Sequence, residues 1–291
     1  MIHQYHCSAL QSGPKLVVLG AIHGNETAGT LGIRHLQQAF ENRQLTLSKG
    51  SLTLIPICNP KAYTNHVRYI ERNLNRELYP KKQLVHYEDF LNPIICAALE
   101  SADVLLDLHS YASKGGPFVF LGDTTQAEID YCLHLGIEDI VYGWTQAFHK
   151  QHSDPKISMG TTEYARSHGA LAVTVECGHH YNEDGPAIAY RTTLAALAYL
   201  NMIDLPTSPP RAPTFVQMQQ VFYKQKPGVF TKPWQHFDWV EQDEPLARFD
   251  DGSELLAPAA GCIILPKAHV ELGQEWFFFG MSTQCPQPLI E

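Results

Sequence analysis

The sequence lacks the features that mark disulfide-stapled and membrane-spanning proteins. Its 291 residues contain no C-x-x-C pair, and the seven cysteines are an odd number, widely scattered along the chain. That pattern is typical of reduced thiols rather than of a disulfide framework or a cysteine-ligated zinc. No window approaches the run of about 18 apolar residues that a transmembrane helix needs.

Positive charge is also scarce. The chain has 21 Lys and Arg against 30 Asp and Glu, a formal net charge of −9, and no basic cluster accompanies an aromatic platform. We therefore expect no nucleic-acid partner. The opening residues, Met1–Lys15, contain no apolar stretch of the kind found in secretion signals. We expect a cytoplasmic protein with no membrane partner.

What the sequence does contain is an alternation of short apolar runs and helical patterns up to Leu205. The apolar runs predict strands over Lys15–Gly20, Ser51–Ile57, Ala102–His109, Pro117–Gly122 and Leu171–Cys177. Apolar positions at helical spacing predict helices over 26–44, 87–101, 127–148 and 186–203, the first beginning near Thr27. Strands that alternate with helices predict an α/β fold with a largely parallel sheet covered on both faces.

The composition changes after this region. Four prolines fall within Leu205–Thr214, which interrupts regular structure and indicates a linker. Turn signals and short β-type runs follow, with little helical periodicity. We predict a catalytic domain over 1–205, a linker over 206–214 and a small all-β domain over 215–291 that packs over the cleft.

A His-x-x-Glu pair, His23 and Glu26, follows the first predicted strand directly. Spacing alone does not make it a site, because the chain holds a second such pair, His180 and Glu183, in a polar loop that indicates a surface turn. The first pair differs in its surroundings. His109 and Glu176 end two further predicted strands, and ligands of open α/β sheets bind at the carboxyl ends of the strands.

Two imidazoles and one carboxylate are the ligand set of hydrolytic zinc, which keeps its fourth position open. His23, Glu26 and His109 fit that role. Water on such an ion loses a proton near neutral pH, and Glu176 is then the expected general base, which passes the proton to a leaving amine. The alternative is that all four are polar strand-end residues without chemistry.

A second cluster brings Arg68, Arg72 and Arg76 together with Asn73 and Asn75 after the second predicted strand. An arginine offers a rigid fork for a carboxylate, and a neighbouring amide adds directional hydrogen bonds. The alternative is a solvated basic helix face. The position, at the same sheet edge, favours anion recognition.

The segments "HGNE", "NPKAY…RYIERNLNRE", "DLHS" and "VECG", in this order, resemble the succinylglutamate desuccinylase and aspartoacylase family, a branch of the zinc carboxypeptidase fold. The resemblance covers roughly 15–205, and the β-rich tail resembles a barrel-sandwich segment. It implies a mixed, largely parallel sheet flanked by helices and one Zn²⁺ per chain. The implied function is a zinc-dependent amidohydrolase that removes an acyl group from an N-acyl amino acid.

The resemblance also implies roles for individual residues. His23, Glu26 and His109 would bind zinc, and Glu176 would promote attack of the zinc-bound water on an amide carbonyl. Arg68 would polarise the carbonyl or its oxyanion, and Asn75 and Arg76 would bind the free carboxylate of the substrate. Arg166, ten residues before Glu176, would be a further substrate-binding arginine. Arg72 has no counterpart.

The sequence departs from the family's pattern at two points. Asn73 replaces an acidic residue that supports the site, and "CGHHYNEDG" replaces a proline-rich turn after Glu176, which puts two histidines near the site. Two alternative functions therefore stay open: a metallocarboxypeptidase or murein-peptide amidase on the same zinc site, and a non-catalytic metal-binding protein. The expected partner is a small molecule with a free carboxylate, and a homo-oligomer is compatible with the sequence.

Overall fold

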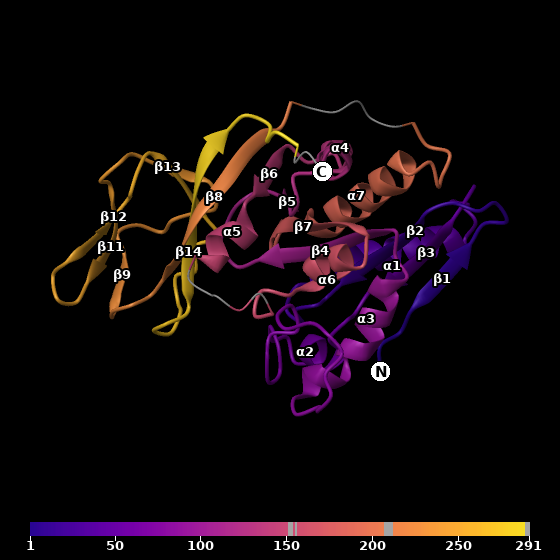
Figure 1. Cartoon of the computed structure of the whole chain (residues 1–291), viewed down its shortest axis with the longest axis horizontal. Helices are drawn as coiled ribbons and strands as arrows, with labels where there is room; N and C mark the ends of the chain where they lie inside the picture. Colours follow the sequence, from indigo (N-terminus) through magenta and orange to yellow (C-terminus); the bar gives the residue numbers. More distant parts are fainter. Residues whose placement is uncertain (151–153, 155, 207–211, 289–291) are drawn as a thin grey trace.

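One sheet of 11 strands runs through the chain, and a second sheet of three strands lies at its far end (Figure 1). The computed structural model describes residues 1–291 apart from 151–153, 155, 207–211 and 289–291. The strands in chain order are β1 Tyr5–Ser8, β2 Lys15–Gly20, β3 Ser51–Ile55, β4 Val104–Tyr111, β5 Phe118–Leu121, β6 Asp139–Tyr142, β7 Leu171–His179, β8 Thr214–Tyr223, β9 Gly228–Phe230, β10 Asp238–Val240, β11 Pro245–Phe249, β12 Glu254–Leu256, β13 Gly261–Ile264 and β14 Glu275–Thr283.

The large sheet has the order β1-β3-β2-β4-β7-β5-β6-β8-β14-β13-β10. Strands β3, β2, β4 and β7 pair in parallel, β5 pairs antiparallel with β7, and β6 and β8 continue in parallel from β5. The direction of the chain therefore changes between β7 and β5. The mixed, largely parallel α/β sheet predicted from the sequence is confirmed.

Helices cover both faces of the sheet, as predicted. They are α1 Thr27–Glu41, α2 Pro60–Thr64, the 3₁₀ turn η1 Tyr87–Phe90, α3 Asn92–Glu100, α4 Gln126–His134, α5 Trp144–His149, α6 Thr161–Ser167 and α7 Gly185–Tyr199. Helices α1 and α4 pack against α7 over one face of the sheet, and α3 packs against α6 over the other. Apolar residues at helical spacing build these layers, and α1 buries Ala28, Ile33 and Leu36.

The apolar run of β2 supplies both layers because neighbouring side chains of a strand point to opposite faces. Leu16 and Val18 belong to the hydrophobic core under α1 and α7, whereas Val17 and Leu19 belong to the core under α3 and α6. An uninterrupted apolar strand is what a sheet covered on both faces requires. This is the reason that β2 occupies the six residues that the sequence predicts.

One helix prediction is wrong. Residues 127–148 form α4, then β6, then α5, rather than a continuous helix. The segment of β6 is a short apolar run, for which spacing alone does not separate strand from helix. Gly136 and Gly143, both with positive φ, mark the turns on either side of β6. These two glycines were the signal for a break.

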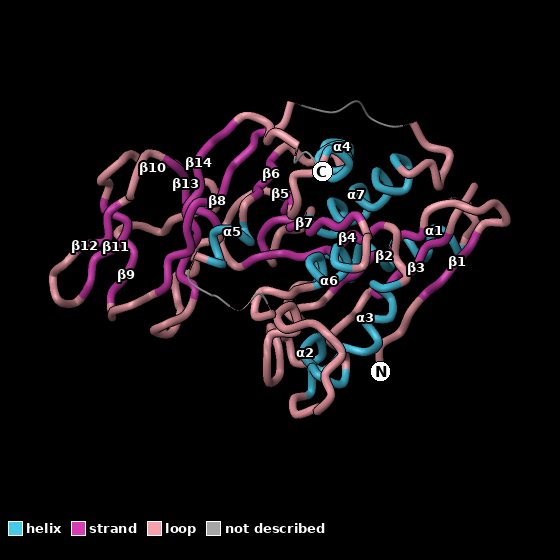
Figure 2. Tube along the Cα trace, viewed as in Figure 1, coloured by secondary structure: helices cyan, strands magenta, loops and turns pink. Residues whose placement is uncertain are grey.

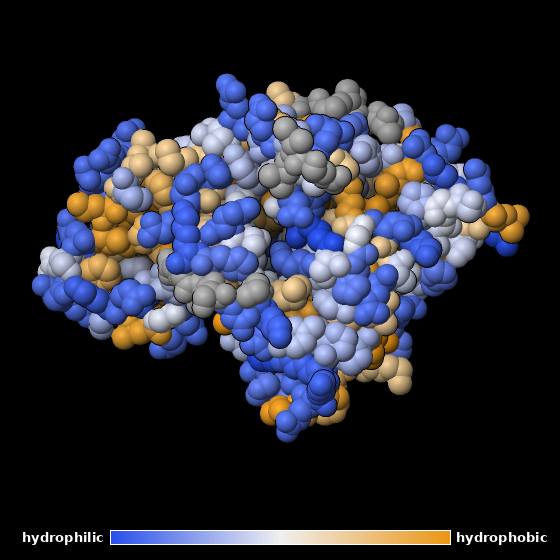
Figure 3. Space-filling view, viewed as in Figure 1, coloured by the Kyte–Doolittle hydropathy of each residue, from blue (hydrophilic) through white to orange (hydrophobic). Residues whose placement is uncertain are grey.

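The described residues between 212 and 288 form strands and loops without a helix (Figure 2). The all-β character predicted for the tail is confirmed, and its first strand, β8, continues the large sheet by pairing in parallel with β6. The view in Figure 3 is hydrophilic over most of its area, with hydrophobic residues gathered at the end that holds β9, β11 and β12.

The division into domains at 1–205 and 215–291 stays a prediction, and most of the linker predicted over 206–214 lies outside the described residues. Within the described part of the chain, no helix is long and apolar enough to cross a membrane.

Candidate functional site

The carboxyl ends of three strands bring the predicted site residues together. Gly20, the last residue of β2, lies beside Leu108 of β4, and His109 lies directly opposite Glu176 of β7. The loop after β2 carries His23 and Glu26 to the same end of the sheet. Parallel pairing therefore produces the convergence that the sequence predicts.

The turn that holds His23 and Glu26 depends on a close approach between two backbones. A Cβ atom added to Gly24 would lie 2.0 Å from the carbonyl carbon of Ala62 in α2, which no side chain can accommodate. The Gly24 N–H donates to the carbonyl of Arg68 at 3.1 Å. Because this residue is glycine, the turn can pack closely against α2 and form a hydrogen bond with the arginine-rich segment.

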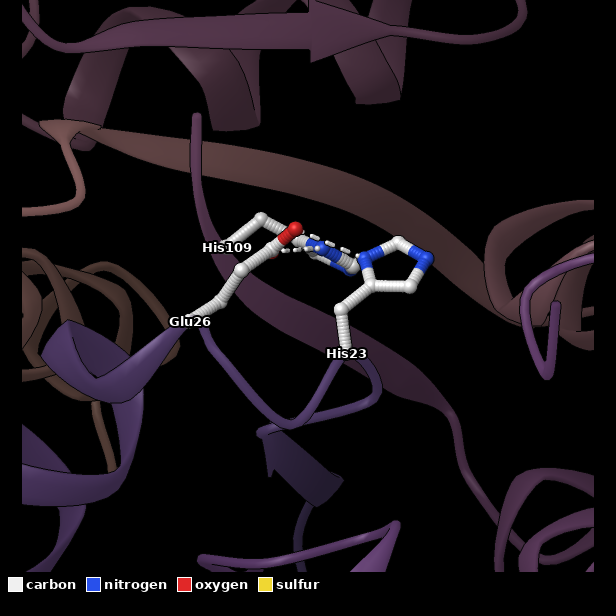
Figure 4. A group of neighbouring side chains, drawn as sticks. All are labelled: His23, Glu26 and His109. Atoms are coloured by element: carbon white, nitrogen blue, oxygen red, sulfur yellow. Dashed lines mark hydrogen bonds and ion pairs between the residues drawn. The ribbon is translucent and has the colours of Figure 1, made fainter. Parts of the chain in front are cut away.

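His23, Glu26 and His109 are buried and face one another (Figure 4). Nδ1 of His23 lies 2.9 Å from Oε1 of Glu26, and Nδ1 of His109 lies 2.8 Å from Oε2. One potential ligand atom from each residue lies within 4.8 Å of the other two. The group can therefore hold a metal ion, as predicted; the identity of that ion is part of the proposal below.

The outer nitrogen of each imidazole is held by a polar side chain. Nε2 of His23 donates to Oδ1 of Asn73 at 3.0 Å, and Nε2 of His109 donates to Oδ2 of Asp107 at 2.8 Å. Thr161 donates to the same Asp107 oxygen. Such outer partners orient metal-binding histidines. Here they leave the Nδ1 atoms of both imidazoles directed at Glu26.

The donor set fits a cation. Burial, and next the charge of Arg68, lowers the pKa of His23 to about 4, so this imidazole is neutral at pH 7. Among the described residues its buried Nδ1 has no hydrogen-bond partner. Burial disfavours the charged form of His109 too, but Asp107 and Glu26 raise its pKa well above the usual value. A divalent cation would suit this site, because it can bind the three ligand atoms and balance the negative charge of the carboxylates.

Asn73 accepts a hydrogen bond from the outer nitrogen of His23, and its role is testable. We expect Asn73→Ala to weaken metal binding by about 10–100-fold, because His23 loses the group that orients it. Asn73→Asp should preserve or strengthen binding. Titration against a competing chelator measures both effects, with Asn42→Ala, at the end of α1, as the control. Equal affinities of the alanine variant and the wild type would contradict the assignment.

Glu176 lies beside this group without belonging to it. Its side chain is buried, and Oε2 has no hydrogen-bond partner among the described residues. Burial, and next the negative charge of Glu26, raises the pKa of Glu176 to about 8. A carboxyl whose pKa lies near neutrality can both accept and donate a proton at working pH.

Arg68 also borders the group of three ligand residues. Its Nη1 donates to Oε1 of Glu26 at 2.7 Å, and 44% of its side chain is exposed. The guanidinium is therefore anchored at one end and open to the pocket at the other.

Arg72, in contrast, is structural. Its Nε donates to Asp89 at 2.6 Å and its Nη2 to Asn92 at 3.0 Å, while Nη1 donates to two backbone carbonyls. The cluster does not form a basic helix face, because the segment beyond α2 is a series of turns. Three arginines that look alike in the sequence thus have separate roles.

Buried Glu88 fixes the backbone of this segment. Its carboxylate accepts from the N–H groups of Ile70, Glu71 and Arg72 and from Nδ2 of Asn59. Burial alone would raise the pKa of Glu88, but these hydrogen bonds hold it below the usual value. The ionised form therefore contributes stability at pH values above the unfolded-state pKa, and this contribution is lost as the pH falls through the folded-state pKa.

We expect Glu88→Gln to lower the free energy of unfolding by about 1–3 kcal/mol at neutral pH, because a charged acceptor of several buried donors is lost. The difference from the wild type should shrink as the pH falls through the folded-state pKa of Glu88, which lies below the usual value for a glutamate. Urea unfolding at neutral and acidic pH measures it, and exposed Glu241→Gln is the control. A difference that does not depend on pH would contradict the prediction.

Asn75 and Arg76 line the same pocket. Oδ1 of Asn75 accepts from the N–H of Thr161 at 2.9 Å, an interaction that does not use its Nδ2 group. Arg76 has Nη2 3.6 Å from Oε1 of Glu275, and Lys267 reaches the other oxygen of this carboxylate at 3.2 Å. Both Glu275 and Lys267 come from the β-rich tail.

Arg166 also borders the pocket, but its charge is already paired. Nε donates to Oε1 of Glu128 at 2.9 Å, Nη1 lies 3.5 Å from Glu163, and Nη2 donates to the carbonyl of Ala172. The substrate-binding role predicted for Arg166 stays a prediction at this point.

The second His-x-x-Glu pair is a turn, as predicted, but not wholly a surface one. His180 lines the pocket and its Nδ1 lies 2.9 Å from Oγ of Ser110. Glu183 lies in an exposed turn and does not line the pocket. The pair is therefore not a ligand pair, and one of the two histidines expected near the site does border it.

The three ligand residues, Glu176 and Arg68 line one pocket of about 930 Å³. Asp107, Lys267 and Glu275 are part of the site but were not predicted from the sequence. A signal existed for Asp107, because residues two apart on a strand share a face, and Asp107 and His109 are two apart. The sequence contained no such signal for the tail residues, since only the fold brings them to the pocket.

The fold and the site together define an α/β protein with a candidate metal centre, the His–Glu–His group, at the carboxyl ends of its parallel strands. The family model of the succinylglutamate desuccinylase/aspartoacylase catalytic domain matches residues 12–203. The chain belongs to this family.

Two curated relatives are similar over part of the chain. One is a probable aspartoacylase from Nostoc sp., 32% identical over 131 residues, which are 42% of this chain and 43% of that protein. The other is an aspartoacylase from Danio rerio, 28% identical over 138 residues, 43% of this chain and 42% of that protein. The match spans less than half the length of either relative.

Solved structures share the fold over nearly the whole chain. A succinylglutamate desuccinylase from Silicibacter sp. superposes with a TM-score of 0.78 at 18% identity, covering 97% of this chain and 89% of that one. A product-bound structure of the ectoine utilization protein EutE (DoeB) from Ruegeria pomeroyi gives a TM-score of 0.77 at 19% identity, covering 96% and 88%. The likeness extends into the β-rich tail.

Proposed function

We propose that this protein is a zinc-dependent amidohydrolase that removes the acyl group from an N-acyl amino acid. The observation that carries the proposal is the position of buried Glu176 opposite His109, next to a group of three ligand atoms but outside it. Membership of the desuccinylase/aspartoacylase family supports the same reaction class.

His23, Glu26 and His109 would hold one Zn²⁺ per chain. Zinc in such a site supplies Lewis acidity and lowers the pKa of water to about 7. Asn73 and Asp107 keep both imidazoles in the tautomer that this role needs. The neutral Asn73, in place of the family's acidic residue, leaves the site with less negative charge.

Glu176 moves the proton in this proposal. Positive charge placed among the three ligands would lower its pKa from the raised value, because opposite charges favour the ionised form. The carboxylate can then take a proton from water, and the carboxylic acid can give it to the departing amine. The absence of a hydrogen-bond partner for Oε2 among the described residues leaves that atom able to do so.

Arg68 and the pair Asn75 and Arg76 position the substrate. The exposed part of Arg68 faces the pocket beside Glu26, where a guanidinium can stabilise the oxygen of an amide carbonyl as its charge develops. Arg76 and the free Nδ2 group of Asn75 would bind the carboxylate of the amino acid.

The first measurement is the metal content of the purified protein together with release of amine from a panel of N-acyl amino acids. About one equivalent of zinc per chain and release from at least one substrate would support the proposal. Zinc without release, but with hydrolysis of a peptide that has a free carboxylate, would favour the carboxypeptidase or murein-peptide amidase alternative. No metal binding after zinc is supplied would refute the proposal.

A further inference from the structure

The positively charged side chains that line the pocket limit which substrates it can bind. Arg166 is one of them. The Arg166 guanidinium meets two carboxylates, Glu128 at 2.9 Å and Glu163 at 3.5 Å, and its side chain is only 13% exposed. Glu128 is itself buried and also accepts from the N–H of Asp123 at 2.6 Å, so it is fixed in place. No net positive charge is left on this side of the pocket for a substrate carboxylate.

Arg166 is also confined sterically. A Cβ atom added to Gly122 would lie 1.6 Å from Nη2 of Arg166, so the guanidinium fills the space beside this glycine at the end of β5. Rotation toward the pocket would require breaking the hydrogen bonds to Glu128 and to the carbonyl of Ala172. Hydrogen bonds and close packing therefore hold the Arg166 side chain in the wall of the pocket.

The other side of the pocket does hold an excess cation. Arg76 and Lys267 share a single carboxylate, Glu275, at 3.6 and 3.2 Å. Two positive charges against one negative charge leave a net charge of about +1 there, which matches one substrate carboxylate. Arg68 is paired with Glu26.

Aromatic side chains form the wall next to this excess cation. The aromatic residues that both line the pocket and pack in one hydrophobic cluster are Tyr111, Phe120, Trp144, Phe148, Tyr223 and Phe278. The Arg76 guanidinium carbon lies 5.0 Å from the ring centre of Trp144 and 5.7 Å from that of Phe148. A carboxylate bound at Arg76 therefore has an apolar surface beside it.

Resting on the proposed function, we propose that the site selects N-acyl amino acids with a single carboxylate and a large apolar side chain. The carboxylate binds at Arg76 and Lys267. The side chain, which leaves the same carbon, packs on the wall around Trp144 and Phe148. A pocket of about 930 Å³ is ample for such a molecule.

The test compares metal-loaded protein on N-acetylphenylalanine, N-acetylleucine, N-acetylaspartate and N-succinylglutamate. We expect kcat/KM to be at least about tenfold higher for the two apolar substrates, because ring or branched-chain burial is lost with an acidic side chain. Higher kcat/KM for either dicarboxylate would overturn the inference while leaving the proposed function intact.

Two variants test the residues. Glu128→Gln removes the main partner of Arg166 and should raise kcat/KM for N-acetylaspartate relative to N-acetylphenylalanine by about tenfold. Trp144→Ala should lower the ratio of N-acetylphenylalanine to N-acetylalanine by about as much, whereas Trp239→Ala, on the outer surface at 53% exposure, should leave it unchanged. Unchanged ratios in both pocket variants would overturn the inference.

A binding measurement separates the two proposals. If no N-acyl amino acid is hydrolysed, the proposed function fails, and the inference is then decided by calorimetry with phenylalanine and aspartate as ligands. Phenylalanine binding that Trp144→Ala weakens would uphold the selectivity of the pocket. Tighter binding of aspartate, or binding of neither, would overturn it.

Discussion

The Glu176→Gln variant is expected to keep its metal and to lose turnover by about 10²–10⁴-fold, the range that a general base contributes. Glutamine has nearly the shape of glutamate, but it cannot take a proton. Because Glu176 lies outside the three-residue ligand group, the metal equilibrium should not change. Metal analysis and steady-state kinetics on the same preparation measure both quantities.

Glu183→Gln is the matched control, since Glu183 lies seven residues later in an exposed turn. It should behave as the wild type in both measurements. Near wild-type activity in Glu176→Gln would eliminate the proposed mechanism. Loss of metal from this variant would instead mean that Glu176 is a ligand.

The second large effect concerns the metal itself. We expect His23→Ala to reduce the bound metal from about one equivalent to a small fraction, because one of three protein ligands is removed. Activity should fall with it. Elemental analysis after dialysis against a weak chelator gives the stoichiometry, and circular dichroism establishes that the fold persists.

His180→Ala is the informative comparison. His180 borders the same pocket and also begins a His-x-x-Glu pair, yet it does not belong to the ligand group. The His180 variant should therefore retain its metal. Equal loss from both variants would show that proximity to the pocket, and not the ligand set, determines metal binding.

Much of the fold was predictable because burial on both faces leaves a plain signal in the sequence. β2 occupies the six residues predicted, and α1 begins at Thr27 as expected. The error over 127–148 has a physical cause. The four residues of β6 are too few to show a period, and only Gly136 and Gly143, at the turns on either side, indicate a break in the helix.

The candidate site was predictable as far as strand ends could place it. His23, His109 and Glu176 converge because parallel strands end at the same edge, a consequence of the alternating pattern. The ion-pair partners of Arg166 and Arg76 could not be predicted from the sequence. Glu128 and Glu275 lie 38 and 199 positions away in the chain from the arginines that they pair with, and no local pattern encodes such contacts.

The pairing of β6 with β8 has a consequence for truncation. If the tail packs over the cleft, as the sequence predicts, removal of Thr214–Glu291 would be expected to widen the substrate range. In the structure, that deletion removes β8 and strips the hydrogen-bond partners from one side of β6. An unpaired strand with buried Ile140 and Val141 is a template for aggregation. The truncated chain should therefore precipitate on expression, and point substitutions in the tail are the way to study its part in substrate choice.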